Sequence, residues 1–131
     1  MKPFKMALLQ TKCGLNKEAN IQYISEALQK AGDNGANISI LGEVCNSPYT
    51  KDYMIQFAED FSSSPTLSSI QKICSQKKMY AIGSIPRKVQ AEGQWNYFNT
   101  AFVVNPEGKL QEQMDKIHLF DIDIPGKITY K

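Results

Sequence analysis

The sequence lacks the features that mark membrane-spanning, secreted and metal-binding proteins. Its 131 residues contain no apolar stretch long enough to cross a bilayer, and the basic start Met1–Lys5 is not followed by the apolar segment of a signal peptide. The three cysteines stand far apart without CxxC spacing, which favours reduced thiols over a disulfide framework. A single histidine argues against a zinc site. We therefore expect a protein of a cytosol-like compartment that holds no metal.

A strong charge of either sign is also absent. The 15 basic and 13 acidic residues leave a net charge of +2, and the short basic pairs Lys77-Lys78 and Arg87-Lys88 are typical of solvated surface. The sequence therefore predicts neither nucleic acid nor a membrane surface as a partner. With 42% hydrophobic and 21% charged residues, the composition is that of a globular protein, and the length suits one domain with a modest core.

Apolar patterning in the first third of the chain predicts a β-α-β unit. Phe4–Leu9 and Ile38–Leu41 are short apolar runs typical of buried strands. Between them Asn16 can cap a helix, and the residues at 32–35 are typical of its end. The apolar stripe of this helix comprises Ile24, Ala27, Leu28 and Ala31. Such a unit favours adjacent parallel strands.

The remainder predicts a second amphipathic helix and three more strands. Ser64 and Pro65 are a favourable helix start, and a short helix is expected within 52–61. The apolar stripe of the helix after Pro65 comprises Leu67, Ile70, Ile73 and Cys74. Strands are expected over Tyr80–Ile85, Phe98–Val104 and 109–117, the last two as an antiparallel hairpin, and a loop over 121–131. We predict an α/β fold whose mixed sheet carries the two amphipathic helices on one face, with nothing evident to cover the other.

Glu43 and Lys116 are the candidate site residues. Glu43 follows a buried strand, where sites of α/β proteins tend to form, and partial burial would raise its pKa toward that of a general base. Alternation places Lys116 on one face with Met114 and His118, where a buried lysine needs a carboxylate or a developing anion. Position alone favours a solvated surface residue in both cases, and a structural role for His118.

The other reactive side chains favour structural roles. Cys74 lies on a helix stripe and is expected in the core, and nothing marks Cys13 as activated. Cys45 would share a face with the nearby glutamate if the strand continued, but a packed loop residue is the expected role. Asp121 and Asp123 are two residues apart, and in a loop such aspartates favour turn capping over paired catalysis.

Several stretches taken together resemble one known family. They are Met6–Gln10, Leu41–Tyr49, Ile82–Pro86, Phe98–Ala101 and Lys116–Thr129. These stretches resemble the nitrilase, or carbon–nitrogen hydrolase, superfamily, and within it the omega-amidase branch. The resemblance covers essentially the whole chain but only the N-terminal part of the family's domain. It implies that residues 1–131 are a partial domain of an α-β-β-α sandwich, truncated before the nucleophile segment, and that the full-length family forms dimers or larger homo-oligomers.

The resemblance also implies a chemistry. Glu43 matches the family's general base and Lys116 the cation that stabilises the oxyanion, while a cysteine thiolate attacks the amide, ammonia leaves and a thioester is hydrolysed. The implied substrates are small ω-amides of α-keto dicarboxylates, such as 2-oxoglutaramate and 2-oxosuccinamate. No cofactor or metal is implied, and the compartment is cytoplasmic with the mitochondrion left open.

The chain departs from the family pattern at positions that bear on its expected activity. None of its cysteines has the Gly-[Ile/Val]-Cys-Tyr-Asp context of the nucleophile, so we expect no turnover by this chain alone. Gly42 replaces a usual proline, Val44-Cys45 a usual Cys-Phe pair, and Asp115 could pair with Lys116 and misalign it. Two alternatives stay open: a non-catalytic half-domain that associates with a partner or a full-length homologue, and an unrelated binding module. The hydrolase interpretation requires the two candidate head groups to meet.

Overall fold

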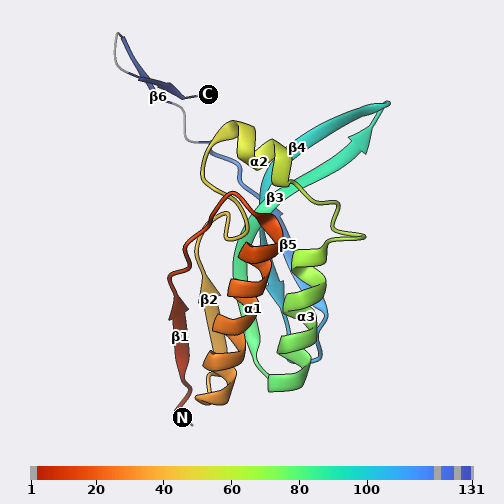
Figure 1. The fold of residues 1–131 in the computed structure, drawn as a ribbon. Coiled ribbons are helices and arrows are strands. Elements are labelled where there is room, and N and C mark those ends of the chain that lie inside the picture. The colour runs from red at the N-terminus through yellow and green to blue at the C-terminus, as the bar shows by residue number, and fades with distance from the viewer. Residues whose placement is uncertain (1–2, 120–121, 126–127, 131) are drawn as a thin grey trace.

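A five-stranded mixed sheet forms the centre of the fold (Figure 1). The structure, a computed structural model, describes residues 3–119, 122–125 and 128–130. The strands lie in chain order across the sheet: β1 (Met6–Leu9), β2 (Ile38–Leu41), β3 (Tyr80–Ala91), β4 (Gln94–Val104) and β5 (Leu110–Asp115). The pairs β1–β2 and β2–β3 are parallel, and the pairs β3–β4 and β4–β5 are antiparallel. This arrangement confirms the predicted mixed sheet and the β4–β5 hairpin.

In the described part of the chain, three helices connect the first three strands: α1 (Lys17–Asp33), α2 (Lys51–Phe57) and α3 (Pro65–Lys77). The side chain of Asn16 accepts a hydrogen bond from the N–H of Ala19, and that of Ser64 accepts one from Leu67. Both predicted helix starts are therefore confirmed, because each side chain satisfies a backbone donor that the first turn leaves unpaired.

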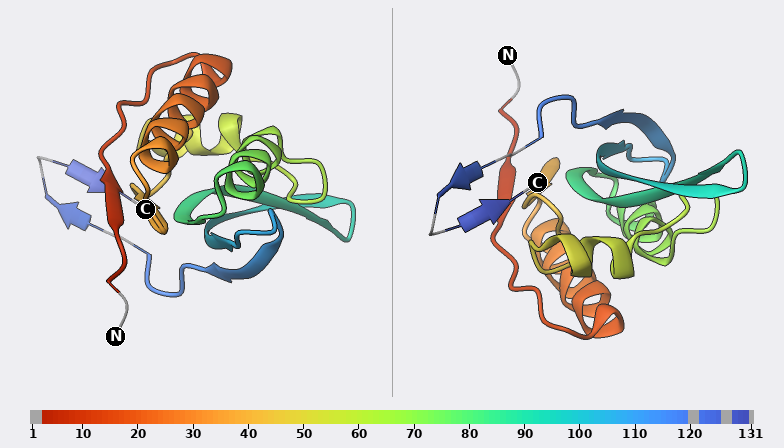
Figure 2. Two further views of the ribbon diagram at one scale, coloured as in Figure 1. Left: turned by 90° about the horizontal axis from the view of Figure 1, so that it is seen from below. Right: turned by 90° about the horizontal axis from the view of Figure 1, so that it is seen from above.

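The core lies between the sheet and the helices α1 and α3, which cover the same face of it (Figure 2). Leu28 of α1, Ile70 of α3 and Ile85 of β3 are fully buried there, and Phe102 of β4 is 1% exposed. Burial of each such side chain is worth about 1.5–3 kcal/mol, so this layer supplies most of the apolar stabilisation. The predicted placement of two helices on one face is confirmed.

The opposite face of the sheet carries large apolar side chains that no described helix covers. Leu8 of β1 is 72% exposed and Met114 of β5 is 65% exposed, whereas Ala7 and Leu9, the neighbours of Leu8 in β1, are packed against the core. We call this surface the bare face and define it by Met6, Leu8, Ile40, Ile82, Ala101, Val103 and Met114. Exposed apolar surfaces are typical of sites of interaction.

Several element boundaries differ from the prediction, among them the first strand, which begins at Met6, and the fifth strand, which ends at Asp115. The strands β3 and β4 continue as a hairpin to a two-residue turn at Glu92 and Gly93, both with positive φ, a geometry that matches the twist of the strands. The short helix expected within 52–61 is α2, which begins one residue earlier at Lys51 and ends at Phe57, and Glu59 then forms a bridge with Arg87 of β3. The predicted loop over 121–131 is wrong in its described part, where β6 (Ile122–Ile124) pairs with β7 (Ile128–Tyr130).

Candidate functional site

A strained turn after β2 carries Glu43. Val44, the next residue, has φ 53°, a left-handed conformation that is rare for a β-branched side chain. The N–H of Val44 donates to Ser84 Oγ at 2.8 Å, and the N–H of Cys45 donates to the Ser84 carbonyl at 2.9 Å. The strand β3 therefore holds the turn in place, and persistent strain of this kind is common at functional sites.

A buried carboxylate anchors the same turn from behind. The Nδ2 of Asn46 donates to Glu59 Oε1 at 3.3 Å, and Glu59 is only 3% exposed. Glu59 also accepts hydrogen bonds from Ser64 Oγ and from the N–H and Oγ1 of Thr66, and its Oε1 lies 2.9 Å from Lys17 Nζ. A buried charge needs such partners. The turn is thereby tied to the starts of both α1 and α3.

Sequence reasoning missed this anchor. Glu59 falls within the segment 52–61, for which a short helix is expected, and nothing in the sequence connects it with Asn46. The only available signal was the concentration of capping side chains around Ser64 and Thr66, which indicates a helix start but not a buried acid behind it.

Lys116 reaches the site from the segment that follows β5. Its backbone N–H donates to the Asn99 carbonyl at 2.8 Å, which fixes the position of the residue beside β4. Its Nζ lies 2.7 Å from Glu43 Oε1, and the Asn99 Nδ2 donates to the same oxygen at 2.7 Å. The hydroxyl of Tyr49 donates to it at 3.3 Å. The expected meeting of the two head groups is therefore observed.

Electrostatics make this contact an ion pair. The hydrogen bond from Lys116, more than the opposing effect of burial, lowers the pKa of Glu43, and Asn99 lowers it further. The hydrogen bond to Glu43 raises the pKa of Lys116 in return. The expectation that burial would raise the pKa of Glu43 is wrong, because its side chain is 47% exposed and touches an ammonium group.

Asp115 does not pair with its neighbour in sequence. Strand alternation directs it to the other face, where Arg87 Nη2 lies 2.7 Å from its Oδ2 and Thr100 Oγ1 donates to its Oδ1 at 2.6 Å. Burial would raise the pKa of Asp115, but these two contacts leave it lowered. The predicted misalignment of Lys116 by Asp115 is therefore wrong.

The remaining candidates lie apart from the pair. Cys45 is buried with Val44, Cys13 Sγ donates to the Cys45 carbonyl, and burial raises the pKa of both thiols. Burial also raises the pKa of Cys74, in the core, to about 12. His118 is exposed. At all three cysteines burial therefore disfavours the thiolate, which is the reactive form of the side chain.

Two further predictions cannot be placed. Asp121 lies outside the described residues, and Asp123 falls in β6 without a described side chain.

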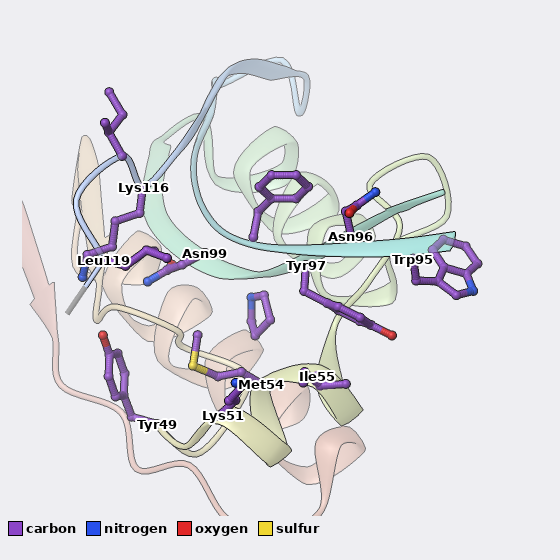
Figure 3. Close-up of a pocket in the computed structure, with 13 residues that line it drawn as sticks. Tyr49, Lys51, Met54, Ile55, Trp95, Asn96, Tyr97, Asn99, Lys116 and Leu119 are labelled. Carbon is purple, nitrogen blue, oxygen red and sulfur yellow. The ribbon is translucent and has the colours of Figure 1, made fainter. Parts of the chain in front are cut away.

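Two cavities meet at the pair, sharing Asn99 and Lys116. The smaller, about 220 Å³, lies on the bare face beside Met114 and includes Glu43. The larger, about 640 Å³, lies between α2, the β3–β4 hairpin and the segment after β5 (Figure 3). Within the described part of the chain, no three His, Cys, Asp or Glu side chains are grouped to hold a metal ion, and no helix is long and apolar enough for a membrane span.

Known proteins resemble both the sequence and the fold. The family model for carbon-nitrogen hydrolase matches residues 5–131. Omega-amidase NIT2 of Homo sapiens is 39% identical over 134 residues, which cover 100% of this chain and 46% of the relative. A hydrolase of Schizosaccharomyces pombe is 37% identical over 130 residues, 98% of this chain and 39% of that protein. The crystal structure of the Caenorhabditis elegans NitFhit protein aligns with a TM-score of 0.79 at 20% identity, over 95% of this chain and 30% of that one.

Proposed function

Because the chain belongs to the carbon-nitrogen hydrolase family, we propose that it carries two of the three working parts of an omega-amidase-like site. Glu43 is the general base and Lys116 is the oxyanion-stabilising cation. The observation that carries the proposal is the 2.7 Å contact between these head groups, which lie 73 residues apart in the chain. The chain spans less than half the length of the curated relatives it matches. The activity of a whole enzyme is therefore proposed for it as well.

The third part is a nucleophilic cysteine that these 131 residues do not include. Its thiol would lose a proton to Glu43, and the thiolate would attack the amide carbon. Lys116 is then released from its carboxylate partner, because Glu43 has become neutral, and its charge becomes available to the oxyanion. Glu43 then gives this proton to the leaving nitrogen, so that ammonia departs as the thioester forms. The restored Glu43 carboxylate takes a proton from the water that hydrolyses the thioester.

The proposed substrates are small ω-amides of α-keto dicarboxylates, 2-oxoglutaramate and 2-oxosuccinamate. Similarity to omega-amidase NIT2 over the entire chain supports this class. We propose that the full-length protein is a cytoplasmic homo-oligomer, a dimer, and that residues 1–131 form the N-terminal part of its domain. No cofactor is proposed, since thiol, carboxylate and ammonium suffice for the reaction.

Activity measurements on a short and an extended chain test this function. The 131-residue chain should show no ammonia release from 2-oxoglutaramate, and a chain extended with the cysteine-bearing part of a relative should release it. Glu43→Gln should lower kcat of the extended chain about 100- to 10,000-fold, the usual contribution of a general base. Turnover by the short chain that Cys45→Ala abolishes would contradict the proposal.

The bare face supports a second candidate function. A half-domain with exposed Leu8 and Met114 could associate with a partner chain or a full-length homologue and modulate it without catalysis. Light scattering distinguishes the two candidates: a monodisperse monomer that unfolds cooperatively would exclude association through this face.

A further inference from the structure

The larger cavity extends from Lys116 along an apolar wall. The wall is formed by Met54 and Ile55 of α2 and by Trp95 and Tyr97 of β4 (Figure 3). Trp95 is 43% exposed and Tyr97 is 44% exposed, so the hairpin holds two large aromatic rings in solvent. Hydrophobic side chains that converge on a concavity, together with a few polar groups, are typical of a small-molecule site.

Charge distinguishes this cavity from a neutral apolar groove. Its lining includes Lys51 and Lys116 and no aspartate or glutamate. The charge of Lys116 is balanced by Glu43, whereas Lys51 forms no ion pair within the described ranges of the chain. The cavity therefore carries one uncompensated positive charge, on the side formed by α2. This charge complements an anionic ligand.

The two cavities at the Glu43–Lys116 pair suit different parts of the proposed reaction. The smaller one opens on the bare face, from which a further segment could deliver a nucleophile to Glu43. The larger one shares Asn99 and Lys116 with it, extends to α2 and the β3–β4 hairpin, and is left for the substrate. An amide held at Lys116 would direct the rest of its chain along the apolar wall toward Lys51.

We propose that Lys51 binds the distal carboxylate of an ω-amide acid whose amide end lies at Glu43 and Lys116. The inference rests on the proposed function for its substrate orientation. The methylene groups of the substrate contact Met54 and Tyr97, and the carboxylate accepts hydrogen bonds from the Lys51 ammonium. Lys51 is thus a specificity residue that distinguishes ω-amide acids from neutral amides, because a neutral amide leaves its charge unmatched.

Binding to the 131-residue chain tests the proposal without any catalytic cysteine. The probes are glutaramate and valeramide, which have the same number of carbons but differ in the distal carboxylate, each titrated into isotope-labelled chain at fixed ionic strength. Glutaramate should shift the backbone amide signals of Asn96, Tyr97 and Lys116 saturably. It should bind about tenfold more tightly than valeramide, as expected for one charge-assisted hydrogen bond.

Variants identify the source of the preference. Lys51→Met should bind glutaramate as weakly as valeramide, and Lys51→Arg should retain the preference. Lys72→Met is the matched control, because it removes the same charge from the exposed face of α3, away from the cavity. Equal affinity for the two probes, unchanged glutaramate binding by Lys51→Met, or no saturable binding would each overturn the proposal.

The extended chain separates this proposal from the proposed function. There, Lys51→Met should raise KM for glutaramate about tenfold and leave KM for valeramide unchanged, since only one substrate contacts the lysine. Glu43→Gln should instead lower kcat for both amides. Retained catalysis with an unchanged KM in Lys51→Met would refute the carboxylate site alone, and catalysis unaffected by Glu43→Gln would refute the proposed function alone.

Discussion

The two faces of the sheet are built from the same strands and differ in what covers them. In β4, Phe102 is 1% exposed beneath α1 and α3, while its neighbours Ala101 and Val103 turn to the bare face. The Glu43–Lys116 pair lies at the end of the sheet beside the bare face, whereas Glu59, which anchors the loop carrying Glu43, lies on the helix side. The helix side thus holds the packed core, and no described helix covers the bare face beside the pair.

The largest expected effect is a loss of packing on the helix face. Phe102→Ala should lower the free energy of unfolding by about 3–5 kcal/mol, because loss of the buried ring leaves an empty space in the core next to Gly83. Met114→Ala on the bare face should change it by about 0.5 kcal/mol or less, since that side chain is already exposed. Chemical denaturation measures both, and equal losses would mean that the bare face is covered in solution.

The next effect concerns the anchor that connects the faces. Glu59→Ala should cost about 2–3 kcal/mol, since Asn46 and Thr66 lose a buried acceptor while Lys17, which is 22% exposed, can turn to water. It should also loosen the strained turn at Val44.

A second readout separates an anchor from simple loss of stability. The pKa of Glu43 is measured in Glu59→Ala under conditions in which the variant is fully folded. It should move toward its ordinary value, because the loosened turn no longer holds the Glu43 carboxylate against Lys116. An unchanged Glu43 titration would show that Ser84 alone holds the turn.

The helix side of the fold was well predicted from the sequence because its buried side chains recur with the period of an α-helix. The stripes from Ile24 to Ala31 and from Leu67 to Cys74 repeat at helix spacing, and the caps Asn16 and Ser64 mark where each helix begins. The meeting of Glu43 and Lys116 was expected from the resemblance and from strand ends rather than from periodicity.

Features that depend on long-range pairing were not predictable in this way. The outer part of the β3–β4 hairpin has exposed side chains and a Glu-Gly turn, so no apolar alternation marks it. The environment of Glu59 depends on three elements that meet only in the folded chain. The direction of the Glu43 pKa shift failed for the same reason, since it is decided by contact with Lys116 and Asn99 and not by burial.

The ion pair sets a pH dependence with a definite sign. The pKa of Glu43 is lower in the folded chain than its ordinary value, so the pair stabilises the fold above that ordinary value and the stabilisation is lost as pH falls through the folded pKa. The pKa of Lys116 is raised in the folded chain, so its effect has the opposite sign with pH. Its stabilisation of the fold is fully present below the ordinary lysine pKa and is lost as pH rises through the pKa of Lys116 in the folded chain.

The most direct test is the titration of the Glu43 carboxyl carbon by NMR in the wild-type chain and in Lys116→Met. The account predicts a pKa below the ordinary glutamate value in the wild type and a return toward that value in the variant, with Lys109→Met as a control that leaves it unchanged. Identical titration curves in the wild type and Lys116→Met would contradict the account, because the two head groups would then not share one site.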